Sequence, residues 1–162
     1  MEIRRATNAD IDAIRELVFS VLAEYGLKSD PAGTDRDLED IEASYFARGG
    51  VFEVVQANDG RIVGSVGLYP LRNRVCELRK MYLARAARGR GLGKQLMDRM
   101  LSQARGLGFR RIELETARPL VEAIGLYQRY GFRPIEGHAL SQRCDQAYAL
   151  DLAGDGSGAN RA

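Results

Sequence analysis

The sequence predicts an α/β fold in which helices flank a central mixed β-sheet. Strand-like and helix-like periodicities alternate along most of the 162-residue chain. Residues 75–116 read as a strand, a glycine-rich loop, a helix and a second strand, a crossover unit whose two strands should be parallel neighbours. The turn Asn58-Asp59-Gly60 indicates a hairpin, which makes the earlier strands antiparallel. We therefore expect a mixed sheet with helices on both faces.

Turn residues and caps divide the chain into elements. Thr7 or Asn8 can cap the first helix, and Gly49 and Gly50 end the second. The expected elements are strand 2–6, helix 7–26, helix 37–50, strand 51–57, strand 61–71, strand 75–83, a helix from 92 to the turn 106–109, strand 110–117, helix 119–131 and strand 145–152. Residues 1–152 are expected to form one domain and 153–162 a disordered tail.

Composition indicates a globular protein and argues against several other classes. Apolar residues make up 45% of the chain and charged residues 28%. No apolar run approaches the roughly 20 residues of a membrane helix, and the N-terminus lacks the apolar core of a signal peptide. We expect a cytoplasmic protein with no membrane partner. Cys76 and Cys144 are too few for a disulfide framework, and His138 is the only histidine, so we expect free thiols and no metal.

The net charge of +2 is unevenly distributed along the chain. Residues 79–111 contain ten basic residues and one acidic residue, whereas the rest contains 14 basic and 21 acidic residues. A basic block within an otherwise acidic protein indicates a local anionic ligand. A nucleic-acid-binding domain would more often be basic throughout, with aromatic side chains for base stacking, so we expect no nucleic-acid partner.

The stretch RGRGLGKQL, residues 88–96, places three glycines and three cationic side chains between a strand and a helix. Such a turn points backbone N–H groups at one spot, and the helix N-terminus adds partial positive charge. Glycine also lets a ligand approach the backbone closely. A phosphate or pyrophosphate is the matching ligand. The P-loop and dinucleotide patterns both fail here, because Gln95 follows the lysine and the glycines alternate at 89, 91 and 93.

The spacing Arg88-x-x-Gly91-x-Gly93 resembles the Q/R-x-x-G-x-G/A signature of the GCN5-related N-acetyltransferase (GNAT) family. The preceding CELRKMYL resembles the family's fourth strand, and EAIGLYQRYGF resembles its late-helix motif A-x-x-L-Y-x-x-x-G-F. This resemblance covers about residues 2–152 and implies the GNAT fold with acetyl-CoA as co-substrate. The implied cofactor-binding residues are Met81, Tyr82 and Leu83 beside the pantetheine arm and Arg88, Gly89, Arg90, Gly91, Leu92, Gly93 and Lys94 around the pyrophosphate.

Acetyl transfer to an amine needs a proton acceptor, support for an oxyanion and a proton donor for the leaving thiolate. A carboxylate can take the amine proton, directly or through water, if burial raises its pKa. The resemblance implies Glu77 as this general base; the alternative is a surface glutamate paired with Arg79. It implies Tyr127 as the acid that protonates the thiolate of CoA; the alternative is a structural tyrosine, with Tyr130 as the rival hydroxyl. The resemblance also implies a bulge at the end of this strand, near Met81, that frees a backbone N–H for the oxyanion.

The acceptor site should lie among the first two helices, their loop and the segment after Phe132. Arg143 and Asp145 either contact the substrate or pair with each other. Leu120 stands where many GNAT relatives carry an asparagine that contacts the pantetheine arm. Four acidic side chains either bind a cationic amine or form a solvated helix face: Asp37, Glu39, Asp40 and Glu42.

These features predict an N-acetyltransferase whose acceptor is a small-molecule amine or an amino acid. One alternative is transfer to an amine of a protein. Another is an acyl-CoA sensor that keeps the glycine loop without turnover. The sequence leaves open whether the protein forms a homodimer, because nothing in it identifies an interface.

Overall fold

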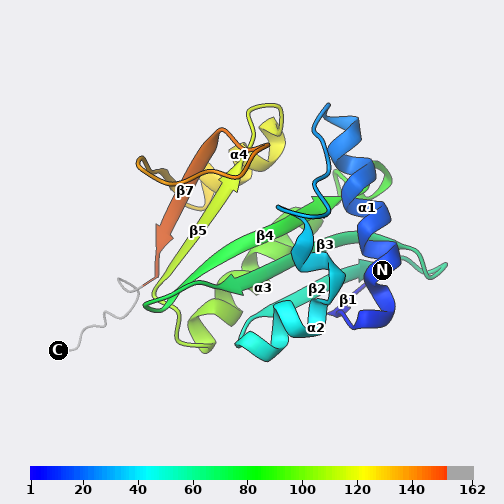
Figure 1. The fold of residues 1–162 in the computed structure, drawn as a ribbon. Coiled ribbons are helices and arrows are strands. Elements are labelled where there is room, and N and C mark those ends of the chain that lie inside the picture. Colours follow the sequence, from blue (N-terminus) through cyan, green and yellow to red (C-terminus); the bar gives the residue numbers. More distant parts are fainter. Residues whose placement is uncertain (153–162) are drawn as a thin grey trace.

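A seven-stranded sheet with the strand order β1-β2-β3-β4-β5-β7-β6 runs through the protein (Figure 1). The computed structural model describes residues 1–152, so the expected tail at 153–162 lies outside the described residues. The strands are β1 (Glu2–Arg5), β2 (Val51–Gln56), β3 (Ile62–Pro70), β4 (Val75–Leu83), β5 (Arg111–Thr116), β6 (Arg133–Pro134) and β7 (Gln146–Asp151). The α-helices are α1 (Ile11–Glu24), α2 (Ile41–Ser44), α3 (Leu92–Gly106) and α4 (Val121–Arg129).

The pairing of the strands confirms the predicted mixed sheet. β1 to β4 pair antiparallel in chain order, and the hairpin between β2 and β3 turns at residues 58–60. β4 and β5 are parallel and are connected through α3, which is the expected crossover unit. β7 pairs antiparallel with β5. The two-residue strand β6, which pairs with β7, is too short to show a periodicity and was missed by the sequence analysis.

Helices cover both faces of the sheet, as predicted (Figure 1). On one face, the apolar side of α1, with Ile14, Val18 and Leu22, packs with Phe52 and Val54 of β2. On the other face, α3 buries the six residues of its expected stripe: Leu92, Leu96, Met97, Met100, Leu101 and Ala104. None of the helices in residues 1–152 is both long and apolar enough to cross a bilayer.

The prediction of a single helix over residues 37–50 is wrong. This segment forms a 3₁₀ turn at Arg36–Glu39, the one-turn helix α2 and another 3₁₀ turn at Phe46–Arg48. Asp40 separates the first 3₁₀ turn from α2, because its backbone is extended and its side chain accepts a hydrogen bond from the N–H of Ala43. An aspartate in this role caps a new helix rather than continuing an old one. Gly49 ends the segment in the left-handed conformation, as expected.

Candidate active site

β4 and β5 separate near the centre of the sheet (Figure 1). Their parallel pairing ends at Glu77 and Glu113, although β4 continues to Leu83 and β5 to Thr116. Two cavities, of about 750 and 340 Å³, lie along the freed part of β4. The cavities adjoin, because they share the lining residues Met81, Tyr82, Leu120 and Ala123. We call the larger one the acceptor cavity and the smaller one the loop cavity.

A β-bulge interrupts β4 where the two cavities meet. Lys80 and Met81 lie opposite the single residue Val66 of β3, and Lys80 has a positive φ of 56°. The Ser65 hydroxyl donates a 2.6 Å hydrogen bond to the carbonyl oxygen of Lys80. A non-glycine residue in this conformation is uncommon and persists only where its surroundings fix it. The structure therefore confirms the bulge that was expected near Met81.

The glycine loop forms one wall of the loop cavity and leads into α3. Gly89 and Gly91 both have a φ of +77°, and Gly91 is the N-cap of α3. A Cβ at either position would meet no atom within 4 Å, so the backbone conformation, and not crowding, favours glycine there. Every cofactor-binding residue expected from the sequence lines this cavity except Arg90, which is exposed. The first turn of α3 thus offers backbone N–H donors to an anion.

Two of the three cations of the loop, Arg88 and Lys94, are paired with acidic side chains of the protein. Arg88 donates to both carboxylate oxygens of Glu24 on α1, and its Nε donates to the carbonyl oxygen of Leu83 at 3.0 Å. This hydrogen-bonded guanidinium lowers the pKa of Glu24. Lys94 pairs with Asp98 at 3.1 Å. The sequence analysis expects Arg88, Arg90 and Lys94 to add positive charge at the loop; in the structure, carboxylates offset the charges of Arg88 and Lys94, so the N–H groups and the helix dipole contribute much of the attraction for an anion.

The acceptor cavity is walled by segments that are far apart in the sequence. The loop after α1 supplies Gly33 and Thr34, and the segment between β6 and β7 supplies His138 and Arg143. These are the regions in which the acceptor site was expected. The expected catalytic residues Glu77 and Tyr127 also line this cavity, so the structure brings the two together.

Glu77 is buried in the wall of the acceptor cavity, with only 9% of its side chain exposed. Its carboxylate is paired with the guanidinium of Arg79, which lies 3.7 Å above the ring centroid of Tyr69. The ion pair with Arg79 is therefore present, but the alternative of a surface glutamate is wrong.

Tyr127 and Tyr130 differ in their surroundings. Tyr127 is buried, its ring lies 5.8 Å from that of Phe132, and its hydroxyl makes no hydrogen bond to any of residues 1–152. Burial raises the pKa of Tyr127, so the phenol stays protonated at neutral pH. Tyr130 lines neither cavity, and its hydroxyl donates a 2.6 Å hydrogen bond to Asp98 of α3. This geometry favours Tyr127 over Tyr130 as a hydroxyl available inside the site.

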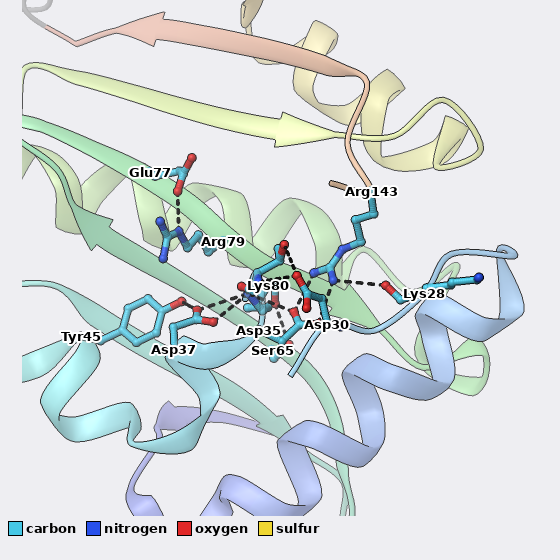
Figure 2. Close-up of polar contacts among 11 residues, drawn as sticks. Lys28, Asp30, Asp35, Asp37, Tyr45, Ser65, Glu77, Arg79, Lys80 and Arg143 are labelled. Carbon is cyan, nitrogen blue, oxygen red and sulfur yellow. Dashed lines mark hydrogen bonds and ion pairs between the residues drawn. The ribbon is translucent and has the colours of Figure 1, made fainter. Parts of the chain in front are cut away.

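A buried ionic network links the bulge to both segments that wall the acceptor cavity (Figure 2). The Nζ of Lys80 donates to Asp37 at 3.0 Å and lies 3.4 Å from Asp35. Asp35 accepts two hydrogen bonds from Arg143, at 2.7 and 2.8 Å. The hydroxyl of Tyr45 donates to Asp37. The side chains of Lys80 and Asp35 are 4% and 0% exposed, so this network is shielded from water.

The carboxylate of Asp35 remains ionised within this network. Burial alone raises its pKa, but hydrogen bonds from Arg143 and from the N–H of Asp30, together with the charge of Lys80, outweigh burial and lower it. Since its pKa is lower than in the unfolded chain, Asp35 stabilises the fold above about pH 4 and loses that contribution as the pH falls further. The sequence analysis missed this network, because its members are far apart in the chain and Lys80 lies in a strand that also carries the charged residues Glu77 and Arg79.

Other polar residues that were left undecided also have partners. Arg143 and Asp145 do not pair with each other: Arg143 pairs with Asp35, whereas Asp145 accepts a hydrogen bond from the N–H of Arg118. Two of the four expected acids stabilise local structure, because Asp40 caps α2 and Glu42 accepts from the N–H of Asn8. Glu39 is exposed at the cavity.

His138 is the only histidine in the sequence, but in the structure it lies beside two carboxylates. One ring nitrogen of His138 and one carboxylate oxygen each of Glu77 and Glu115 lie within 4.8 Å of one another. These three residues are the group, among residues 1–152, whose geometry could hold a metal ion. The two cysteines are free, as expected. Burial raises the pKa of the Cys76 thiol to about 12, which keeps it protonated and unreactive.

The fold and the two adjoining cavities define an α/β protein with a glycine loop at a helix N-terminus beside an acid- and phenol-lined cleft. Residues 15–132 match the acetyltransferase (GNAT) family. The chain therefore belongs to the GNAT family, and the predicted family and fold are confirmed. Members of this family are acetyltransferases that use acetyl-CoA.

Known proteins similar to this chain bear out the assignment. The uncharacterized N-acetyltransferase YjgM of Escherichia coli is 41% identical over 139 residues, which cover 83% of each chain. The crystal structure of a GNAT-family acetyltransferase from Staphylococcus aureus Mu50 superposes with a TM-score of 0.88 at 26% identity, over 93% of this chain and 98% of the other. YncA of Salmonella typhimurium, solved with acetyl-CoA, has a TM-score of 0.70 at 25% identity and covers 94% of both chains.

We predict that Lys80→Met destabilises the protein strongly. The change leaves the buried carboxylate of Asp37 without its cation, and removing one partner of a buried ion pair costs about 3–5 kcal/mol. Urea unfolding followed by circular dichroism measures the loss. Lys94→Met is the matched control, because Lys94 is an exposed lysine with an exposed partner. Equal unfolding midpoints for the two variants would contradict the structural role of Lys80.

Proposed function

We propose that this protein transfers the acetyl group of acetyl-CoA to the primary amine of a small molecule or amino acid. The observation that carries the proposal is the meeting of two cavities at the bulge of β4. The loop cavity offers N–H donors to a diphosphate, and the acceptor cavity, at about 750 Å³, is of the size that holds small molecules. A thioester reaching the shared residues Met81 and Tyr82 would face an amine that enters from the other side.

Acetyl-CoA fits the loop cavity in its chemistry as well as in its position. The glycine loop and the first turn of α3 would bind the pyrophosphate through backbone N–H groups. The edge of β4 that β5 leaves free would pair with the pantetheine arm, along Met81–Leu83. A backbone N–H at the bulge would hold the thioester oxygen as it becomes an oxyanion. Leu120 lines both cavities and would contact the arm through apolar surface only.

Glu77 and Tyr127 supply the proton transfers in this proposal. Glu77 accepts the proton of the attacking amine, directly or through one water molecule, while the amine nitrogen bonds to the carbonyl carbon. The carbon–sulfur bond then breaks, the hydroxyl of Tyr127 gives its proton to the thiolate, and the resulting phenolate regains a proton from solvent before the next turnover. The raised pKa of Tyr127 keeps that proton in place until the thiolate forms.

The acceptor class is tested by measuring release of free CoA from acetyl-CoA with a panel of amines, amino acids and peptides. We expect turnover with at least one small amine or amino acid. Acetylation of peptides or proteins alone would show that the acceptor is a protein amine and not a small molecule. Binding of acetyl-CoA without turnover of any amine would show that the protein is an acyl-CoA sensor and not an enzyme.

We predict that Glu77→Gln lowers kcat/KM by about 100-fold or more and removes the acid limb of its pH profile, because a general base contributes on that scale. The substitution also leaves Arg79 without its partner. The double variant Glu77→Gln/Arg79→Met removes both members of the pair and is the control for that effect. If the double variant recovered wild-type activity, an unpaired Arg79, and not a lost base, would explain the single variant.

We predict that Tyr127→Phe lowers kcat about 100-fold while the dissociation constant for acetyl-CoA changes less than about twofold. The ring remains to fill its place beside Phe132, and only the proton donor is lost. Tyr130→Phe is the matched control, because its hydroxyl lies outside both cavities, and it should keep nearly full kcat. Loss of acetyl-CoA binding by Tyr127→Phe, measured by calorimetry, would show that the hydroxyl has a structural role instead.

A further inference from the structure

Three acidic side chains and the single histidine face one another at the β5 side of the acceptor cavity. Nε2 of His138 lies 3.0 Å from Glu115, and Nδ1 lies 3.9 Å from Glu113. A ring nitrogen of His138, an oxygen of Glu115 and an oxygen of Glu77 are all within 4.8 Å of one another. All four residues line the cavity. This cluster comes from β4, β5 and the segment between β6 and β7.

A base in the position of Glu77 has to return its proton to solvent before each new turnover. The carboxylate of Glu77 is nearly enclosed, whereas the side chain of His138 is 20% exposed. One water molecule bridges polar groups that are up to about 5 Å apart, since each of its hydrogen bonds spans about 2.8 Å. The separation of Glu77 from His138 falls within that reach.

We propose that His138 is the relay that carries the proton from Glu77 to solvent. This inference rests on the proposed function, in which Glu77 is the base. A neutral imidazole has one N–H and one nitrogen with a free lone pair. The protonated Glu77 gives its proton to a bridging water, and that water gives a proton to the free ring nitrogen. The resulting imidazolium releases a proton to solvent and returns to the neutral ring, so the proton that Glu77 accepts leaves the site in each turnover.

The charges around His138 suit this task. Glu113 and Glu115 of β5 flank the ring and stabilise the imidazolium while it exists. Arg111 pairs with Glu113, and Arg79 pairs with Glu77, so neither cation contacts the imidazole in the described residues.

Cys144 also lines this cavity and is held protonated because burial raises the pKa of its thiol. The side chain of His138 is 20% exposed, which places it between the enclosed carboxylate of Glu77 and bulk water.

A purely structural role is the competing explanation, because Glu115 also accepts a hydrogen bond from the N–H of Ser141 and so holds the same segment. His138→Gln and His138→Ala separate the two. Glutamine keeps a side-chain donor for Glu115 but cannot relay a proton, so both variants should lose kcat about tenfold or more with an unchanged KM for acetyl-CoA. Added imidazole should restore the rate of His138→Ala in a saturable manner and leave the wild type unaffected. Full activity in His138→Gln, or no recovery with imidazole, would overturn the relay.

A second measurement does not depend on turnover. His138 is the only histidine, so its ring signals in a proton NMR spectrum are unambiguous. Glu77→Gln removes a negative charge near the ring and should shift the midpoint of the His138 titration to lower pH. Asp59→Asn, in the exposed turn between β2 and β3, removes the same charge elsewhere and should leave the midpoint unchanged. Equal midpoints in all three proteins would contradict the coupling between Glu77 and His138.

The two proposals fail in different ways. If the wild-type protein releases no CoA with any amine of the panel, the proposed function is refuted. If the wild-type protein turns over normally and the His138 variants are equally active, only the relay role of His138 is refuted.

Discussion

The buried pairing of Lys80 with Asp35 and Asp37 is the constraint on which the site depends. An ammonium group taken out of water has to be matched by carboxylates, and here those carboxylates come from the loop that follows α1. The same lysine occupies the left-handed backbone conformation at the bulge of β4. One side chain therefore fixes both the strand irregularity and the wall of the acceptor cavity. Arg143 extends this link to the segment before β7.

The bulge and the early end of the β4–β5 pairing together explain why two cavities meet at one point. A continuous parallel ladder would close the space between these strands with hydrogen bonds and packed side chains. Because the ladder stops at Glu77, the remaining edge of β4 faces the glycine loop on one side and the acceptor cavity on the other. In the proposed function, binding of an anionic donor and recognition of an amine therefore fall to separate walls, and the two substrates meet at the junction of the cavities.

Local sequence predicted most of the fold because its signals are local. Strand β4, the α3 stripe, the hairpin at residues 58–60 and the conformation of the glycine loop all follow from periodicity and turn chemistry within a few residues. The break at Asp40 was missed because an aspartate can lie within a helix or cap a new one. Neither the Lys80–Asp35 pairing nor the approach of His138 to Glu77 could be predicted, since each joins segments more than 40 residues apart through tertiary contacts. Arg88 was identified correctly as part of the family motif. Its ion pair with Glu24 could not be predicted, because it too is a contact between distant segments.

The most direct test of the central claim is a crystal structure of the complex with acetyl-CoA. We expect the pyrophosphate oxygens within hydrogen-bonding distance of the backbone N–H groups of residues 89–94. The thioester should lie beside Met81, with the hydroxyl of Tyr127 directed at its sulfur. A pyrophosphate bound away from the glycine loop, or a thioester outside the junction of the two cavities, would contradict the assignment of the site.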